Sequence, residues 1–176
     1  MNNAFPWYVL TGGPCSGKTA LIDELKQRGY SVFPEPARIV IASELAQGKS
    51  IQDILADSRG LQHKILAHYL ELETEAPKDQ ILFLDRGVPD VAAYYRKFNL
   101  SSDEVLKNAL ASVRYREVFL LNMIEFVNDA ERYETPQEAA ILHRYLRDAY
   151  TEQGYDVIEV PVVPVPERAD FILKNL

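Results

Sequence analysis

The feature that most constrains this chain is a glycine-rich segment between a short apolar run and a helical stripe. The apolar run covers residues 7–11, and the stripe continues through Leu21, Ile22 and Leu25. A strand before such a segment and a helix after it are the context that a phosphate-binding loop, or P-loop, requires. The segment matches the pattern G-x-x-x-x-G-K-[ST] in full and consists of Gly12, Gly13, Pro14, Cys15, Ser16, Gly17, Lys18 and Thr19.

This loop predicts a site for a nucleoside triphosphate. Its glycines let successive backbone N–H groups converge on phosphate oxygens at the N-terminus of the helix. Lys18 is expected to reach the β- and γ-phosphates of ATP, and Thr19 to bind Mg²⁺. The alternative is a tight turn with a solvated lysine, but the pattern arises by chance at only about one position in 10⁴. Cys15 is expected to be a small filler of the loop.

Apolar runs that alternate with helical stripes predict an α/β fold. Such an alternation implies right-handed crossovers and a parallel sheet of about five strands with helices on both faces. The expected architecture is a three-layer P-loop NTPase sandwich, in one domain over residues 1–176. The strands are expected at residues 7–11, 31–33, 81–84, 118–121 and 156–160.

Three local predictions concern the connections between these strands. Gly60 is expected to break a long helical stripe, and a loop is expected to open at Arg86-Gly87. Ser101 and Glu104 have the spacing of a capping box at the start of the next helix. The connections 35–80 and 122–155 are too long for one helix each, and the second is expected to include a lid-like segment at about residues 122–136.

Composition and charge exclude several classes of protein. With 47% hydrophobic residues in 176, the chain can form one well-buried core. A single cysteine excludes an internal disulfide and a thiolate metal cluster, and a net charge of -7 disfavours nucleic acid as a partner. No apolar run is long enough for a membrane span and no signal peptide is visible, so a cytoplasmic location is expected.

Two charged residues follow the expected third strand. Asp85 lies where a Walker-B carboxylate would hold Mg²⁺ directly or through water, although an aspartate there can also cap the next segment. Arg86 follows at the same edge of the sheet. It is expected to pair with a phosphate or with a neighbouring carboxylate.

Glu35 and Arg38 follow the expected second strand. Pro36 suits the first position of a helix, which places Arg38 in a first turn where a cation opposes the helix dipole, so an anionic partner is expected. Glu35 lies at the same edge as the P-loop and is predicted to accept a proton from a substrate hydroxyl. The alternative is a local ion pair between Glu35 and Arg38 that only ties the turn.

Arg132 lies in a charged stretch of the second long connection. A loop arginine there is expected to close over the transferring phosphoryl group and stabilise its charge. A solvated run of charges is the alternative interpretation.

Several segments in this order resemble a small P-loop family. The chain is similar to the AAA-labelled ATPase/kinase family that resembles the ribosylnicotinamide kinase domain of the NAD-biosynthesis regulator. The resemblance covers nearly the whole chain and implies a fold like that of nucleoside and nucleotide kinases. It is carried by the P-loop, Pro34-Glu35-Pro36-Ala37-Arg38, Leu84-Asp85-Arg86-Gly87, Pro89-Asp90, Asn128-Asp129, Arg132-Tyr133-Glu134-Thr135 and Val160-Pro161-Val162.

Deoxynucleoside kinases look similar at two further points. Their Glu-Pro pair, whose Glu serves as base, is matched by Glu35-Pro36, and their acidic-Arg pair by Asp85-Arg86. The resemblance implies that substrate contacts involve Glu35, Arg38, Arg86 and Asp90. This chain has Asp-Arg-Gly where those kinases usually have Glu-Arg-Ser, and it is too short for the helical lid domain of hexameric AAA motors.

The leading hypothesis is an ATP-dependent kinase that acts on a nucleoside-like or other small hydroxyl-bearing metabolite. Glu35 would be the base, and Lys18 and Arg132 would stabilise phosphoryl charge. Asp85 and Arg86 are also expected among the catalytic residues. Thr19 and Asp85 would hold Mg²⁺. The alternative is a nucleotide-dependent regulatory ATPase or GTPase binding module, and a P-loop scaffold that no longer catalyses is a third hypothesis.

Overall fold

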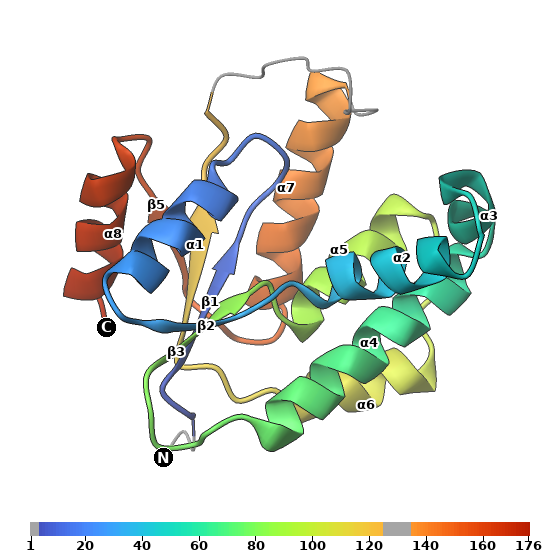
Figure 1. Cartoon of the computed structure of the whole chain (residues 1–176), viewed down its shortest axis with the longest axis horizontal. Helices are drawn as coiled ribbons and strands as arrows, with labels where there is room; N and C mark the ends of the chain where they lie inside the picture. Colours follow the sequence, from blue (N-terminus) through green and yellow to red (C-terminus); the bar gives the residue numbers. More distant parts are fainter. Residues whose placement is uncertain (1–3, 125–134) are drawn as a thin grey trace.

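The computed structural model of the protein describes residues 4–124 and 135–176. Within them the strands form one parallel sheet in the order β2-β3-β1-β4-β5 (Figure 1). The predicted α/β fold and all the predicted strands are confirmed. The strands are β1 (Trp7–Thr11), β2 (Ser31–Phe33), β3 (Leu82–Asp85), β4 (Glu117–Leu121) and β5 (Val157–Val160).

Helices cover both faces of the sheet and make three layers (Figure 1). One face packs against α1 (Lys18–Gln27) and α8 (Val165–Lys174). The other face packs mainly against α4 (Ser58–Glu75), α5 (Val88–Lys97) and α7 (Pro136–Thr151). Three further helices pack against α4, namely α2 (Pro36–Ala46), α3 (Ile51–Ala56) and α6 (Glu104–Ser112).

The sheet is the centre of the core because its inner strands are covered on both sides. Every residue of β1 is buried, as a parallel strand between two helical layers requires. Leu10 and Phe119 pack toward α1 and α8, whereas Val9 and Val118 pack toward the opposite layer. No helix in the described part of the chain is long and apolar enough to cross a membrane. The cytoplasmic location stays a prediction.

The break in the long helical stripe lies at Asp57 and not at Gly60, so that prediction is wrong. α3 ends at Ala56 and α4 begins at Ser58. The Asp57 carboxylate caps α4 by accepting a hydrogen bond from the Gly60 N–H at 2.9 Å. A Cβ atom at Gly60 would lie 2.1 Å from an Asp57 carboxylate oxygen, so the glycine makes room for the cap.

The capping residue of α6 is also one that the sequence pattern missed. Asp103, and not Ser101, is the N-cap, and its carboxylate accepts a hydrogen bond from the Leu106 N–H at 3.0 Å. Arg59 and His63 bind the same carboxylate at 2.6 Å and 2.9 Å. These long-range contacts fix Asp103 at the start of the helix, and they are invisible to a local pattern.

A helix follows β3 where a loop was predicted. α5 begins at Val88, directly after Gly87, with a proline in its first turn. The Asp90 carboxylate accepts a hydrogen bond from the Gly87 N–H at 3.0 Å, and the Tyr115 hydroxyl accepts one from the Val88 N–H at 2.9 Å. Because the N-cap is a glycine, the usual serine or threonine signal is absent.

One buried carboxylate makes the stability of the fold depend on pH. Glu73 of α4 accepts a hydrogen bond from the Tyr115 hydroxyl, which itself accepts one from the Val88 N–H at 2.9 Å. Burial raises the pKa of Glu73 from 4.5 to about 7. Between these two values the unfolded chain releases the proton and the folded chain keeps it, so the free energy of unfolding falls as the pH rises.

We expect Glu73→Gln to remove this loss, because a glutamine oxygen can still accept the Tyr115 hydrogen bond without becoming charged. The wild-type protein should lose up to about 3 kcal/mol of unfolding free energy through this group between about pH 4.5 and about pH 8. Urea unfolding across that range measures the difference between the two proteins. Glu75→Gln, at an exposed position of the same helix, is the matched control, and an equally steep pH dependence in Glu73→Gln and wild type would contradict the assignment.

Candidate functional site

The glycine-rich segment forms a loop between β1 and α1, as predicted. Gly17 is the N-cap of α1 with φ 74°, and no side chain caps the helix. A Cβ atom at this position would lie 2.8 Å from the Ile124 Cδ1 atom and 3.0 Å from the Arg168 Nη1 atom, so only glycine fits. The first N–H groups of α1 are therefore not capped by any side chain. Uncapped N–H groups at the start of a helix form a site for an anion.

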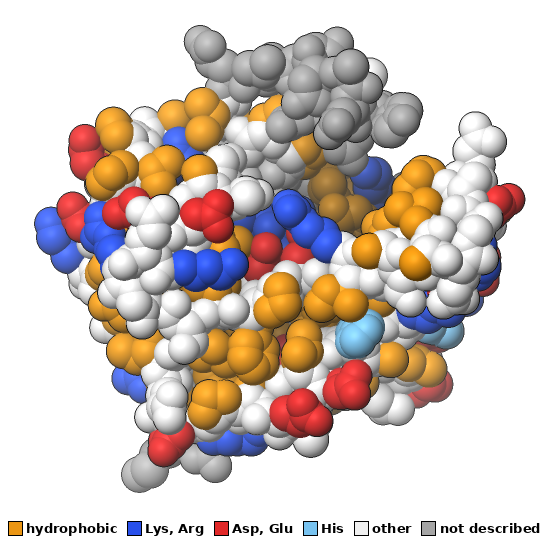
Figure 2. Space-filling view, viewed as in Figure 1, with side chains coloured by type: hydrophobic (Ala, Val, Ile, Leu, Met, Phe, Trp, Pro, Cys, Tyr) orange, Lys and Arg blue, Asp and Glu red, His pale blue; other side chains and the backbone are white. Residues whose placement is uncertain are grey.

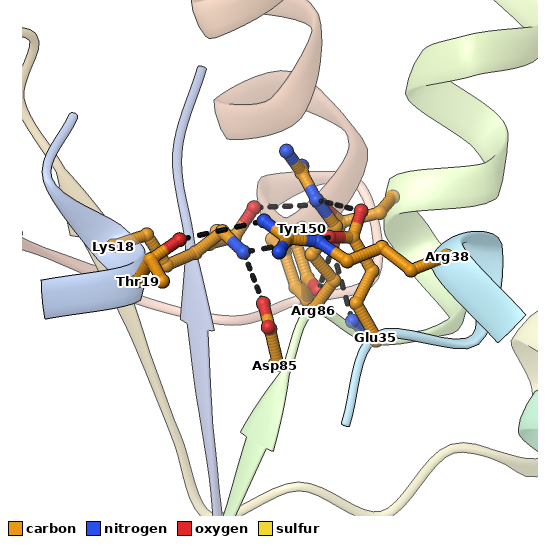
Figure 3. Close-up of polar contacts among 10 residues, drawn as sticks. Lys18, Thr19, Glu35, Arg38, Asp85, Arg86 and Tyr150 are labelled. Atoms are coloured by element: carbon orange, nitrogen blue, oxygen red, sulfur yellow. Dashed lines mark hydrogen bonds and ion pairs between the residues drawn. The ribbon is translucent and has the colours of Figure 1, made fainter. Parts of the chain in front are cut away.

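Strand register brings Lys18, Asp85 and Glu35 to one edge of the sheet. Leu10 of β1 pairs with Asp85, and Phe33 of β2 pairs with Leu84. The carboxyl ends of β1, β2 and β3 therefore lie side by side. The Lys18 ammonium group forms a short contact with the Asp85 carboxylate and lies 3.8 Å from Glu35 Oε2 (Figure 3).

Arg86 lies beside Glu35 and is almost completely buried. Its Nε atom is 2.8 Å from Glu35 Oε1, and its Nη1 atom donates to Asp90 Oδ1 at 2.8 Å. The guanidinium carbon lies 5.7 Å from the centre of the Tyr94 ring. The predicted pairing of Arg86 with neighbouring carboxylates is thus present, and its other predicted role, toward a phosphate, stays a prediction.

Arg38 reaches across from α2 toward the P-loop (Figure 3). Its Nε atom donates to Glu35 Oε2 at 3.1 Å, and its Nη2 atom donates to the Thr19 hydroxyl at 3.4 Å. The Arg38 side chain is 66% exposed, so it is free to change partner at low cost. The predicted local ion pair between Glu35 and Arg38 is therefore present, but Glu35 also contacts Arg86 and faces Lys18.

The charges of this cluster shift one another. Burial lowers the pKa of Lys18, and the nearby Arg86 charge lowers it further, against the opposing effect of Asp85 and Glu35. Burial alone would raise the pKa of Glu35, but the charges of Arg86, Lys18 and Arg38 hold it below its ordinary value. Burial raises the pKa of Asp85 despite its contact with Lys18. The surrounding cations thus favour the ionised form of Glu35, whereas burial works against ionisation of Asp85.

Asp90 is buried among protein donors. Its Oδ1 atom accepts hydrogen bonds from the Thr11 hydroxyl at 2.7 Å and from Arg86, and its Oδ2 atom accepts one from the Tyr150 hydroxyl at 2.5 Å. It is only 2% exposed, although it also borders the cavity described next. These contacts favour a role in holding Arg86, and its predicted contact with substrate stays a prediction.

A cavity of about 340 Å³ lies beside Glu35 and Arg38, between α2, α4 and α5. Figure 2 shows the same region as a hollow where acidic and basic side chains meet, with hydrophobic side chains to its right. Gln62 and Tyr69 line the cavity and are 3% and 4% exposed. Within residues 4–124 and 135–176 neither side chain has a hydrogen-bond partner. The other lining residues include Ala37, Ile41, Leu55, Leu61, Ile65, Val91, Tyr94, Lys97 and Phe98.

Beyond the predicted charged residues of the site, sequence reasoning missed the residues that line the cavity and the supports of the P-loop. Gln62 has a usable signal, because it lies three and seven residues before Ile65 and Tyr69 on one helical stripe and is the polar member of that stripe. Tyr150 and Arg168 carry no local signal, since they reach the site from distant helices. Arg132 and most of the predicted lid-like segment 122–136 lie outside the described residues.

The parallel sheet with a G-x-x-x-x-G-K-T loop after its central strand defines a P-loop NTPase fold. Within this class, the chain belongs to the AAA domain family, whose model matches residues 7–168. The predicted family resemblance is therefore confirmed. No curated protein matches the sequence.

Solved structures of kinases share this fold. The structure of deoxyadenosine kinase from M. mycoides with the products dCMP and a flexible dCDP is 15% identical, with a TM-score of 0.66 over 96% of this chain and 97% of that one. Thymidylate kinase from Candida albicans is 13% identical, with a TM-score of 0.66 over 98% and 91%. The NadR protein in complex with NR is 17% identical, with a TM-score of 0.70 over 96% of this chain and 49% of that one.

Proposed function

We propose that the protein is a kinase that transfers the γ-phosphoryl group of ATP to a hydroxyl group of a nucleoside-like metabolite. The observation that carries this proposal is the cavity of about 340 Å³ next to Glu35 and one side chain away from the P-loop lysine. A protein that only binds or hydrolyses a nucleotide needs no second pocket there. The kinase structures that share the fold support the same function.

The residues at the P-loop fit Mg²⁺ together with a triphosphate. The described residues contain no group of three or more His, Cys, Asp or Glu side chains that could hold a metal ion. Thr19 and Asp85 offer one hydroxyl and one carboxylate, and Mg²⁺ commonly binds one or two protein ligands plus phosphate oxygens. When bound, the ion would neutralise charge on the phosphates.

The cavity suits a small acceptor with a flat ring and polar edges. A volume of about 340 Å³ lies at the lower end for small-molecule sites and suits a metabolite of nucleoside size. The aromatic rings of Tyr94 and Phe98 provide flat apolar surface. The Gln62 and Tyr69 side chains line the cavity and have no hydrogen-bond partner among the described residues. Such groups favour a ligand that supplies the missing hydrogen bonds.

In the proposed reaction Glu35 accepts the proton of the acceptor hydroxyl as its oxygen attacks the γ-phosphorus and the bond to the β-phosphate oxygen breaks. Lys18 and Arg86 stabilise the charge that spreads over the transferring group. Asp90 holds Arg86 in place. The proposal also includes stabilisation of phosphoryl charge by Arg132 and a lid at about residues 122–136. Arg132 and most of that segment lie outside the described residues.

The direct test is phosphoryl transfer from labelled ATP to a panel of ribonucleosides, deoxynucleosides and ribosylnicotinamide. We expect a phosphorylated product with at least one member of the panel and little hydrolysis without an acceptor. Steady ATP or GTP hydrolysis that no acceptor stimulates would instead favour the regulatory NTPase module.

We expect Gln62→Leu to raise the KM for the acceptor by about 10-fold to about 100-fold, because the loss of a buried hydrogen bond to substrate costs about 1–3 kcal/mol. The KM for ATP should stay unchanged, since Gln62 lines only the acceptor cavity. Gln52→Leu, at an exposed position of α3, is the matched control. Equal acceptor KM values in both variants would remove Gln62 from the acceptor site.

A further inference from the structure

Arg168 is a buried cation that sits behind the P-loop. It lies on α8, which is far from the loop in sequence, and is only 3% exposed. Its Nη1 atom donates a hydrogen bond to the Ser16 carbonyl at 2.9 Å, and its Nε atom donates one to the Val163 carbonyl at 2.7 Å. In the described part of the chain no carboxylate pairs with it. Burial lowers the pKa of its guanidinium group.

A buried arginine without a carboxylate partner among the described residues is costly, so its position needs a reason. Packing of α8 against α1 does not provide that reason, because other hydrogen bonds already join these two helices. Arg28 of α1 binds Asp170 at 2.6 Å and the Pro166 carbonyl at 3.0 Å. Arg168 instead contacts the backbone of the loop that would hold the phosphates.

Two consecutive carbonyl groups of the P-loop accept hydrogen bonds from donors outside the loop. The Cys15 carbonyl accepts a hydrogen bond from the Ile124 N–H at 2.9 Å, and the Ser16 carbonyl accepts the one from Arg168. In a planar trans peptide the C=O of one residue and the N–H of the next point in opposite directions. Each external donor therefore turns the following N–H, that of Ser16 or of Gly17, toward the inside of the loop.

The Ser16–Gly17 peptide is the one that most needs such a support. Gly17 has φ 74°, and a glycine can reach alternative backbone conformations at little steric cost. A rotated peptide would turn a carbonyl oxygen toward the phosphates in place of an N–H group. Within residues 4–124 and 135–176 the N–H groups of Ser16 and Gly17 have no acceptor, so they are available to an anion.

We propose that Arg168 is a positioning residue of the P-loop, whose guanidinium group holds the Ser16 carbonyl outside the loop and so directs the Gly17 N–H toward the phosphates of a bound nucleotide. This inference rests on the proposed function in so far as it requires the P-loop to bind ATP. It assigns a role to the C-terminal helix, which otherwise only covers the sheet.

The test compares Arg168→Met and Arg168→Lys with the matched control Arg28→Met, which removes the other tie between α1 and α8. We expect Arg168→Met to raise the Kd for ATP by about 10-fold or more, as loss of a hydrogen bond from a charged donor implies. Amide hydrogen exchange of residues 12–19 in the nucleotide-free protein should become faster. Arg168→Lys keeps the charge and a donor and should recover part of the affinity.

Arg28→Met should lower the thermal stability but leave the Kd for ATP unchanged. The KM for the acceptor should be the same in all three variants, since a positioning effect on the P-loop does not reach that cavity. The inference is overturned if Arg168→Met binds ATP as tightly as wild type, or if Arg28→Met loses as much affinity. If wild type itself binds no ATP, the proposed function fails instead, so the two failures are distinguishable. If Arg168→Met does not fold, the same comparison is made with Arg168→Lys, where unchanged affinity and exchange would overturn the inference.

Discussion

Replacing Glu35 with glutamine is expected to leave ATP bound and to slow phosphoryl transfer by on the order of 10² or more, the usual contribution of a general base. Glutamine keeps the size of the side chain and an oxygen that can face Arg86, but it cannot take up the acceptor proton. The charges of Arg86, Lys18 and Arg38 keep Glu35 ionised in the free protein. The rate of a single turnover at saturating ATP and acceptor measures the effect.

The matched control is Glu44→Gln in α2, the helix for which Glu35 is the N-cap residue. The Glu44 side chain is 10% exposed and pairs with Lys49 and Lys64, whereas the Glu35 side chain is 11% exposed. Both substitutions remove a carboxylate that is largely buried between cations, but only Glu35 lies next to the P-loop. If Glu35 merely ties its turn to Arg38, the two variants should lose similar stability and neither should lose transfer, which would exclude Glu35 as the base.

The sequence was sufficient to predict which charged residues meet at the strand ends. Lys18, Glu35 and Asp85 all follow apolar runs that pattern analysis identifies as strands, and parallel strands place their carboxyl ends at one edge. Their approach in space therefore follows from topology alone. The α/β architecture was predictable for the same reason, since alternation of strands and helices leaves few arrangements.

The residues that support this site were not predictable, because their contacts cross the fold. Asp90 gathers Thr11 from β1 and Tyr150 from α7 around Arg86. No spacing in the sequence relates Thr11 or Tyr150 to Asp90, although Arg86 and Asp90 lie four residues apart. α5 itself was missed because its N-cap is Gly87, which has no capping side chain, and because the acceptor of the Val88 N–H is the Tyr115 hydroxyl from outside the helix.

The cavity beside Glu35 and Arg38 is an intermediate case. Its walls come from α2, α4 and α5, so its volume depends on how three helices pack, which a sequence pattern does not specify. Gln62 nevertheless stands out as a polar residue on an apolar stripe, and such a position is a signal for a site that needs a buried polar group. We expect the ligand of the cavity to depend on the Gln62 side chain more than on the fold.

Lys18→Met is expected to have the largest effect of any single substitution in the site. We expect kcat/KM for ATP to fall by on the order of 10³ or more, because the loss of one preorganised cation at the transferring group costs about that much. The loss also leaves Asp85 and Glu35 near each other without the ammonium group between them. Burial already raises the pKa of Asp85, and removal of the cation should raise it further.

Because removing one partner of a buried ion pair can itself unfold a protein, the experiment includes Lys18→Arg, which keeps the charge opposite Asp85. A guanidinium group is planar and larger than the compact ammonium group, so we expect this variant to fold and still to lose transfer by on the order of 10². Lys26→Met, at an exposed position of the same helix, should behave as wild type. Full transfer in Lys18→Arg would show that the site needs only a positive charge there, and near wild-type transfer in a folded Lys18→Met would exclude the P-loop lysine from the reaction.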